Sequence, residues 1–469
     1  MLSRGIVSFV TSRDPDAVLM EHLSAMSLRQ DRAPSPRAPG QPLEVLLSGY
    51  FGAGNTGSEM RASEIVRHMR RLLGPDNVAF SALSLTNDLP RDLFPGVRAC
   101  TLSGFYPDVV AAEIAKCHAV VACEGSTFKS TFSEVLTALM AGTLGAAARA
   151  EQPAIAYGAE VGTLTPRLEA YVRDNARGAL IMARNQASVE RAEALGLRTL
   201  SGADTAWTFT SSPPEVARQW LARAGWNGVD PIVVFCPVNP FWWPVRAEPA
   251  TFAAMQRTGQ GRDRHYGAVF FHSNDEIASA RYGVFIRQLA DAFERLRVAR
   301  NAFPVVIGMD RVDAAACADL IARMPFGAAV FRSGEHDVGD LIAILRQADL
   351  VVSARFHALV GAMPSGAPSI GLAFDERVGN LMRGAEPGRA LAADAPDLAD
   401  QIVAAAGRLD PDVVRAEARA RIGAELDGMA RMAHGLRAEF GRFAPDLSLP
   451  DLHDGPVGAL PLDIQRILA

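Results

Sequence analysis

An arginine and a histidine stand two residues apart in the segment DLVVSARFHALVGAMPSG, residues 349–366. Arg355 and His357 follow an apolar run that predicts a strand, and they share one side if the chain stays extended. Arginine offers a planar fork to a carboxylate or phosphate, and histidine can pass a proton near neutral pH. The pair could therefore bind an anion and protonate it. The structural alternatives are a salt bridge for Arg355 and a satisfied ring at a helix start for His357.

A glycine-rich loop, FGAGNTGSE, separates an apolar run from a helical pattern at residues 51–59. Its G-x-G-x-x-G spacing comes from Gly52, Gly54 and Gly57. A dinucleotide fingerprint also needs an acid at the end of the next strand, to bind the ribose. That strand ends in Ser84 and Thr86, so we expect no NAD. Backbone N–H groups at the helix start and the Asn55 side chain instead favour a loop that binds a polar ligand. The alternative is a turn that merely needs glycine.

Further polar side chains follow other predicted strands. They are Glu124 with Gly125 and Ser126, Glu160, Arg184 and Arg377. Ligands of open α/β sheets bind beyond the carboxyl ends of the strands, so these residues are candidates for the same site. Trp242 and Trp243, in NPFWWPV, could stack on a sugar ring. Packing of the loop or of the hinge is the alternative, and the sequence favours it.

The elements that must position these residues alternate between strand and helix from Leu43 onward. The strands are continuous apolar runs, which indicates parallel sheets covered by helices on both faces. We predict two doubly wound, Rossmann-like α/β domains at residues 43–210 and 229–385, facing a cleft. Residues 1–42 form an N-terminal extension with a Pro-rich linker at 31–42, and residues 386–469 a helical tail that steadies the two domains.

Composition excludes several classes of protein. The chain has 469 residues, 49% apolar and 21% charged, as in globular proteins, and its net charge of −5 gives no basic stripe for nucleic acid. No two of the cysteines have C-x-x-C spacing, so we expect neither a metal nor a redox motif. They are Cys100, Cys117, Cys123, Cys236 and Cys317. Finding no targeting or membrane-spanning segment, we predict a cytoplasmic protein that needs no cofactor.

The motifs as a set resemble the polysaccharide pyruvyl transferase family. GYFGAGNTGSE is similar to that family's G-Y-x-G-x-G-N-x-G-D-E loop, and SARFHALVGAMPSGAPSIGLAFDERV to its R-L-H segment with G-x-P and the following strand. VVACEGST is similar to its strand ending in a glycine pair. ARNQASVERAEALG with GADTAW is similar to its R-D-x-x-S segment and later aspartate. The order and spacing also match, over about residues 43–385.

The resemblance implies a glycosyltransferase-B-like architecture with the acceptor on the first domain and the donor on the second. Members of the family move the enolpyruvyl unit of phosphoenolpyruvate onto a sugar as a ketal that bridges two hydroxyls, and phosphate leaves. The candidates to bind the donor anion are Arg355, Arg184 and Arg377. His357 would protonate the methylene carbon, and Glu124 or Glu160 would accept the hydroxyl proton.

Four positions depart from the family pattern. The aspartate after G-N-x-G is Ser58, the glycine pair is Glu124-Gly125, the R-D pair ends in Asn185, and the usual lysine after the last strand is Arg377. Glu124 could be an added catalytic base or a side chain that narrows the pocket. The departures leave the acceptor open: a cell-wall polymer, an exopolysaccharide or a lipid-linked oligosaccharide, the last bringing the protein to the inner face of the membrane.

Two other functions fit the same architecture. One is a nucleotide-sugar-dependent glycosyltransferase, which would carry an acid near G-x-P, where the sequence reads MPSGAPS. The other is a non-catalytic sugar-binding homologue that lost activity with the substitutions at Ser58, Glu124 and Asn185. Release of phosphate by the purified protein would distinguish the last possibility.

Overall fold

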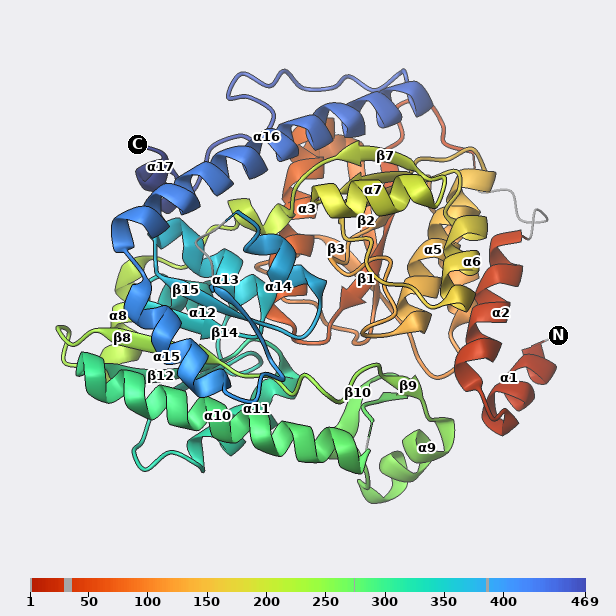
Figure 1. Ribbon diagram of the computed structural model, residues 1–469. Helices are drawn as coiled ribbons and strands as arrows, with labels where there is room; N and C mark the ends of the chain where they lie inside the picture. Colours follow the sequence, from red (N-terminus) through yellow and green to blue (C-terminus); the bar gives the residue numbers. More distant parts are fainter. Residues whose placement is uncertain (1, 29–35, 274, 385–387) are drawn as a thin grey trace.

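Two parallel sheets, each covered by helices on both faces, form the computed structural model of the chain (Figure 1). The structure describes residues 2–28, 36–273, 275–384 and 388–469. Part of the expected Pro-rich linker, residues 31–35, and the expected domain boundary at 385–386 lie outside the described residues.

The first sheet has seven strands in the order β3-β2-β1-β4-β5-β6-β7, and every pair in it is parallel. In that order the strands are β3 (Val97–Thr101), β2 (Val78–Ser84), β1 (Leu43–Phe51), β4 (Ala119–Ala122), β5 (Ala154–Ala159), β6 (Leu180–Ala183) and β7 (Arg198–Ser201). The helices of this half are α3 (Thr56–Leu73), α4 (Pro107–Ile114), α5 (Glu134–Arg149), α6 (Pro166–Asn175) and α7 (Gln186–Ala194). β4, β5 and β6 are buried along their whole length, which explains their unbroken apolar sequences.

The second sheet has six parallel strands in the order β13-β12-β8-β14-β15-β16. They are β13 (Ala329–Arg332), β12 (Phe303–Gly308), β8 (Ile232–Cys236), β14 (Leu350–Ser353), β15 (Ser369–Ala373) and β16 (Ala390–Ala392). Its helices are α10 (Glu276–Arg300), α11 (Ala314–Ile321), α12 (Val338–Leu345), α13 (Phe356–Ala362), α14 (Glu376–Leu381) and α15 (Leu398–Arg408), and α8 (Pro214–Arg223) connects the two halves.

Smaller elements surround these halves. They are the helices α1 (Leu2–Thr11), α2 (Pro15–Leu28) and α9 (Pro249–Thr258), the strands β9 (Arg246–Ala247), β10 (His265–Gly267) and β11 (Phe270–Phe271), and the 3₁₀ turns η1 (Pro75–Asn77), η2 (Thr205–Thr208), η3 (Arg262–Arg264), η4 (Arg311–Asp313) and η5 (Met363–Ser365). The apolar run GAVFFHS, at residues 267–273, belongs to the small antiparallel sheet β10-β11-β9 and not to a parallel sheet. The first apolar run, GIVSFV, lies within the helix α1.

Within the expected tail, residues 386–469, β16 and α15 belong to the second half, so that domain extends beyond the predicted boundary. The tail beyond them forms α16 (Pro411–Phe443) and α17 (Leu462–Leu468). Figure 1 shows α16 running along both halves of the molecule. It contacts β7 and α3 of the first half and η5 of the second. The backbone N–H of Ala203, which follows β7, donates to the thioether sulfur of Met432 in α16. The helical tail therefore packs across both halves, as a steadying element would.

The expectation of two doubly wound halves with a helical C-terminal region is confirmed by this topology. No helix among the described residues has the length and apolarity that crossing a bilayer requires.

Candidate functional site

A pocket lies between the two halves, where loops after their strands meet. It is lined on the first half by Tyr50, Asn55, Gly57, Ser58, Glu124, Ser126, Phe132 and Leu136, and on the second by Trp243, Tyr266, Met309, Asp310, Arg355, Phe356, His357 and Arg377. Of the residues predicted from sequence, the pocket therefore gathers the arginine–histidine pair, one of the two candidate carboxylates and part of the glycine loop.

His357 reaches the pocket because it lies in the first turn of α13, directly after β14. Its ring fits against Gly57: a Cβ atom at that position would stand 2.1 Å from the imidazole Nδ1. The other ring nitrogen, Nε2, lies 3.4 Å from a carboxylate oxygen of Asp204. Burial lowers the pKa of His357 below its ordinary value of 6.5, against the opposing effect of Asp204. The free protein thus holds a neutral imidazole oriented by a carboxylate.

Asp204 is held by two buried arginines. The Nε atom of Arg61 donates to it at 3.1 Å, and Nη1 of Arg184 at 2.8 Å. Burial would raise the pKa of Asp204, but Arg61 and His357 outweigh it and hold that pKa well below its usual range. Arg61 also donates to three backbone carbonyls, those of Cys123, Tyr157 and Gly158. The carboxylate that faces His357 is therefore ionised and rigidly fixed.

Arg355 lines the pocket but is already paired. Its Nε and Nη2 atoms donate to both oxygens of Asp313, and Nη2 lies 3.6 Å from Asp310. Burial alone would lower the pKa of Arg355, but these two carboxylates raise it. Nη1 makes no hydrogen bond with any residue that the structure describes. Arg355 therefore forms the salt bridge that the sequence left open as its structural role. Its Nη1 edge is left for the pocket.

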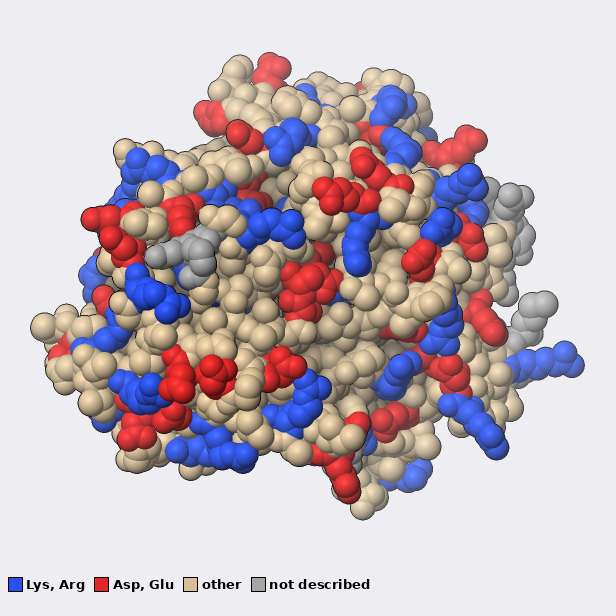
Figure 2. All heavy atoms as spheres, in the orientation of Figure 1, with Lys and Arg blue, Asp and Glu red and all other residues tan. Residues whose placement is uncertain are grey.

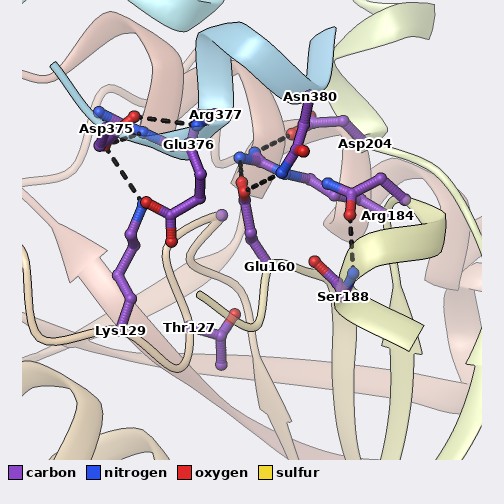
Figure 3. A network of polar contacts seen from close by, with 12 residues as sticks. Thr127, Lys129, Glu160, Arg184, Ser188, Asp204, Asp375, Glu376, Arg377 and Asn380 are labelled. Carbon is purple, nitrogen blue, oxygen red and sulfur yellow. Dashed lines mark hydrogen bonds and ion pairs between the residues drawn. The ribbon is translucent and has the colours of Figure 1, made fainter. Parts of the chain in front are cut away.

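Arg377 is the second cation of the pocket. Its Nε atom donates to Asp375 at 2.8 Å and its guanidinium lies 4.2 Å from the ring centre of Phe132. Asp375 also accepts from Lys129 at 3.2 Å, so a buried lysine of the first half supports the arginine of the second (Figure 3). Neither Nη atom of Arg377 has a hydrogen-bond partner among the described residues. These atoms are available to an anionic ligand.

The structure places two other predicted residues behind the pocket wall. Glu160 is fully buried and pairs with Arg184, while the side-chain amide of Asn380 donates to its second oxygen at 3.2 Å (Figure 3). The Arg184 guanidinium lies 4.3 Å from the ring centre of Phe356. Neither Glu160 nor Arg184 lines the pocket. Their geometry fits positioning of Asp204 and α13 better than direct contact with a ligand.

The glycine loop docks one half onto the other. The backbone N–H of Thr56 donates to Met309, that of Arg311 donates to Gly54, and the Ser333 hydroxyl donates to the same Gly54 carbonyl. Asn55 caps α3 by accepting from Ser58 and donates to Asp310 at 2.6 Å. The loop's polar groups are therefore largely used between the halves. Besides the lining residues Asn55 and Ser58, the loop gives the pocket the space that Gly57 leaves for His357.

The remaining glycines leave room for neighbouring side chains. A Cβ at Gly52 would stand 2.5 Å from the Thr86 hydroxyl, at the strand end where a dinucleotide-binding protein would carry an acid. A Cβ at Gly125 would stand 2.8 Å from both Arg184 and Arg61. These contacts explain the glycines without a bound nucleotide.

The two tryptophans have different positions. Trp243 lines the pocket and meets Phe132 edge to face, with ring centres 5.0 Å apart. Trp242 stacks on His272 at 3.9 Å and is not part of the wall. Only Trp243 could contact a sugar in this pocket.

The family of this chain is shown by comparison with models of protein families. The model of the polysaccharide pyruvyl transferase family matches residues 55–376. The chain belongs to the polysaccharide pyruvyl transferase family. Membership supports a transferase of polysaccharide biosynthesis. Comparison with curated proteins found no sequence match.

Solved structures share the fold. A protein from Listeria monocytogenes assigned as a UDP-N-acetylglucosamine 2-epimerase has a TM-score of 0.54 at 10% identity, covering 86% of this chain and 97% of its own. The Anabaena protein HepE, solved with UDP-glucose, has a TM-score of 0.50 at 14% identity, covering 85% and 99%. At these identities the likeness supports the two-domain fold of glycosyltransferases and epimerases.

Two departures from the family pattern lie in contact. The Ser58 hydroxyl donates to Glu124 at 2.8 Å, so the residue that replaces the family's aspartate touches the residue that replaces its glycine. A carboxylate therefore lies in the pocket on the loop that follows β4. A third departure, Asn185, caps α7 by accepting from the backbone of Ser188, a role that asparagine and aspartate fill equally.

A second cavity between the halves, of about 520 Å³, contains a buried acid. Glu59, in the first turn of α3, lines it together with Gly54 and Arg311. Burial, reinforced by Asp310, raises the pKa of Glu59 from 4.5 to about 7. Its carboxyl makes no hydrogen bond to a described residue.

Glu59 is expected to make the fold less stable as the pH rises. An acid whose pKa is higher in the folded than in the unfolded chain binds more protons when folded. The contribution of Glu59 to the free energy of unfolding is therefore greatest below pH 4.5 and declines until about pH 7. Glu59→Gln should remove that decline, at most about 3 kcal/mol. Urea unfolding at pH 5 and pH 8 measures it, with the exposed Glu215→Gln as the control. An equal decline in Glu59→Gln and wild type would contradict the assignment.

Sequence reasoning missed several residues of the site. Asp310 and Asp313 follow β12, and Arg61 lies within α3, where a basic residue on a helix gives no functional signal. The position after a strand could have pointed to the aspartates. Lys129 is one of only two lysines of the chain, which was visible in the sequence but not its burial between two carboxylates. In the described ranges, no cluster of His, Cys, Asp and Glu side chains could hold a metal ion.

Proposed function

We propose that this protein transfers pyruvate from phosphoenolpyruvate onto two hydroxyls of a sugar, forming a cyclic ketal and releasing phosphate. The observation that carries the proposal is the pocket in which an Asp204-oriented His357 stands beside two arginines and a carboxylate. Family membership and the paired domains support it. The sugar would belong to a polysaccharide or to its precursor.

The arginines would bind the donor. The unpaired Nη atoms of Arg377 and the Nη1 edge of Arg355 suit the carboxylate and phosphate of phosphoenolpyruvate, since guanidinium groups bind such anions through two N–H bonds. Asp313 and Asp310 offset much of the Arg355 charge, so Arg377 would contribute more of the attraction.

Proton transfers follow from the remaining groups. His357 would give a proton to the methylene carbon, which becomes the methyl group, and the positive character at the adjacent carbon would be met by a sugar hydroxyl. Glu124 would accept that hydroxyl's proton. A second hydroxyl would then displace phosphate and close the ketal. The proton held by Glu124 would then pass to His357, and the proton of the second hydroxyl would leave with phosphate, so both residues return to their starting state and protons and charge balance.

Arg377→Ala is expected to weaken phosphoenolpyruvate binding by about 10- to 100-fold, the value of one or two charged hydrogen bonds. Arg355→Ala should also weaken it, because it removes the Nη1 edge and leaves Asp313 and Asp310 without their buried counter-charge. Calorimetric titration measures both variants, with Arg323→Ala, a partly exposed position on the second half, as the control.

The same titration separates the rival functions. Parallel runs with UDP-glucose and NAD would show binding of neither if the proposal holds. Binding of the nucleotide sugar alone would overturn the proposal in favour of a glycosyltransferase, and binding of none of the three would favour a non-catalytic homologue.

A further inference from the structure

Five arginines converge on a cavity of about 510 Å³ on the connection between the two halves. They come from α8, α16, α17 and the residue that follows α12, and one aspartate accompanies them: Arg218, Arg346, Arg415, Arg419, Arg466 and Asp463. The whole chain has a net charge of −5, and basic and acidic side chains are interspersed over the face in Figure 2. A cavity with five positive charges and one negative charge is therefore a local exception.

The carboxylates near these arginines neutralise them only in part. Arg218 lies 3.6 Å from Glu215, which does not line the cavity. Asp463 lies 2.9 Å from Arg346 and 3.9 Å from Arg466, so one carboxylate serves two guanidinium groups. Arg419 donates to a backbone carbonyl, that of Ile467, and not to an acid. Arg415 forms no hydrogen bond or ion pair with any residue that the structure describes.

Arg346 gives the cavity a fixed floor. Its side chain is 5% exposed and donates to the Ser211 hydroxyl at 2.9 Å and to the carbonyl of Gly361 at 3.1 Å. Burial lowers its pKa, against the opposing effect of Asp463. Keeping a guanidinium buried costs free energy unless other groups compensate, and an anion in the cavity would add such a group.

We propose that this hinge cavity, as we call it, binds a diphosphate group. Its volume lies in the range of small-ligand pockets. Several guanidinium groups that line one cavity match a compact anion with several oxygens, because each planar fork can hold two of them. An extended polyanion would call for an open basic stripe instead.

The position of the hinge cavity gives binding a consequence. Ser211 and Ser212, which line it, belong to the segment that joins the halves, and Arg415 and Arg466 belong to the tail. A diphosphate would therefore bridge the connection and the tail helices, and it should raise the thermal unfolding temperature.

Calorimetry with sodium pyrophosphate tests the proposal on the full chain. Replacing Arg415 and Arg419 together by alanine should weaken binding by about 10- to 100-fold, as expected for lost charged hydrogen bonds. The matched control is Arg442→Ala, an exposed arginine near the other end of α16. A third variant, Arg377→Ala, identifies binding at the interdomain pocket.

Each outcome of these titrations either supports or overturns the proposal. Loss of pyrophosphate binding in the Arg415 and Arg419 variant, with binding kept in Arg442→Ala and Arg377→Ala, would support the hinge cavity. Binding that is lost only in Arg377→Ala, or no binding to the wild type in either arm, would overturn it. The second arm uses phosphatidylcholine vesicles containing a polyprenyl diphosphate. If the Arg415 and Arg419 variant loses only vesicle binding, the diphosphate is carried by a lipid. Pyruvyl transfer has no part in these measurements, so they fail or succeed independently of the proposed function.

Discussion

His357→Gln is expected to lower the turnover of phosphoenolpyruvate by about 10²- to 10⁴-fold, the usual contribution of a general acid. Glutamine fills similar space beside Gly57 and keeps a polar group near Asp204, but it cannot deliver a proton. Phosphate release in the presence of a saccharide fraction from the source cells measures the effect. His434→Gln, at an exposed position of α16, is the control.

A second measurement on the same variant separates proton transfer from structure. Burial keeps His357 neutral in the free protein, and an anion arriving beside it should raise its pKa. Phosphoenolpyruvate binding should therefore take up a proton in the wild type and not in His357→Gln, which titrations in buffers of different ionisation enthalpy detect. Normal turnover, or unchanged proton uptake, in the variant would remove His357 from the mechanism.

The two sheets could be predicted because their strands are buried on both faces. Such strands read as unbroken apolar runs, as in AVVA of β4 and LVVS of β14, and the helices between them dictate parallel pairing. GAVFFHS is a similar apolar run, but it belongs to a separate antiparallel sheet. An apolar composition indicates that a strand is buried, but tertiary contacts determine which strand it pairs with.

The site could be predicted only where the position of a residue along the chain indicates where its side chain points. His357 and Glu124 follow strands, and the structure places both in the pocket. Glu160 and Arg184 also follow strands, yet they point into a buried ion network. Burial of a charge depends on partners far away in sequence, such as Asp204 and Arg61, and spacing within one segment cannot reveal it.

The departures from the family pattern illustrate the same limit. From the sequence, Ser58 and Glu124 are separate substitutions at positions 66 residues apart. In the structure, their side chains share a hydrogen bond at the pocket wall. If Glu124 supplies the carboxylate that the family pattern places at position 58, this part of the pocket keeps one acid, which agrees with the proposal that Glu124 is the base.

Exchanging the two residues should therefore restore what either single change destroys. Glu124→Gly removes the proposed base and is expected to lower kcat by about 10²-fold. Ser58→Asp alone places two carboxylates in contact, which raises the pKa of one of them and repels the anionic donor, so it should also impair turnover. The double variant, with one carboxylate again, should recover most of the activity.

A double-mutant cycle on kcat and on phosphoenolpyruvate affinity measures this coupling. Because the side chains are in direct contact, their effects should be far from additive, with the double variant better than both singles. If the double variant is as inactive as Glu124→Gly, the carboxylate must come from Glu124 itself. An aspartate at position 58, as in the family pattern, could then not replace it in this protein. Should Glu124→Gly be fully active, the base lies elsewhere, and Asp310 is the remaining carboxylate on the pocket wall among the described residues.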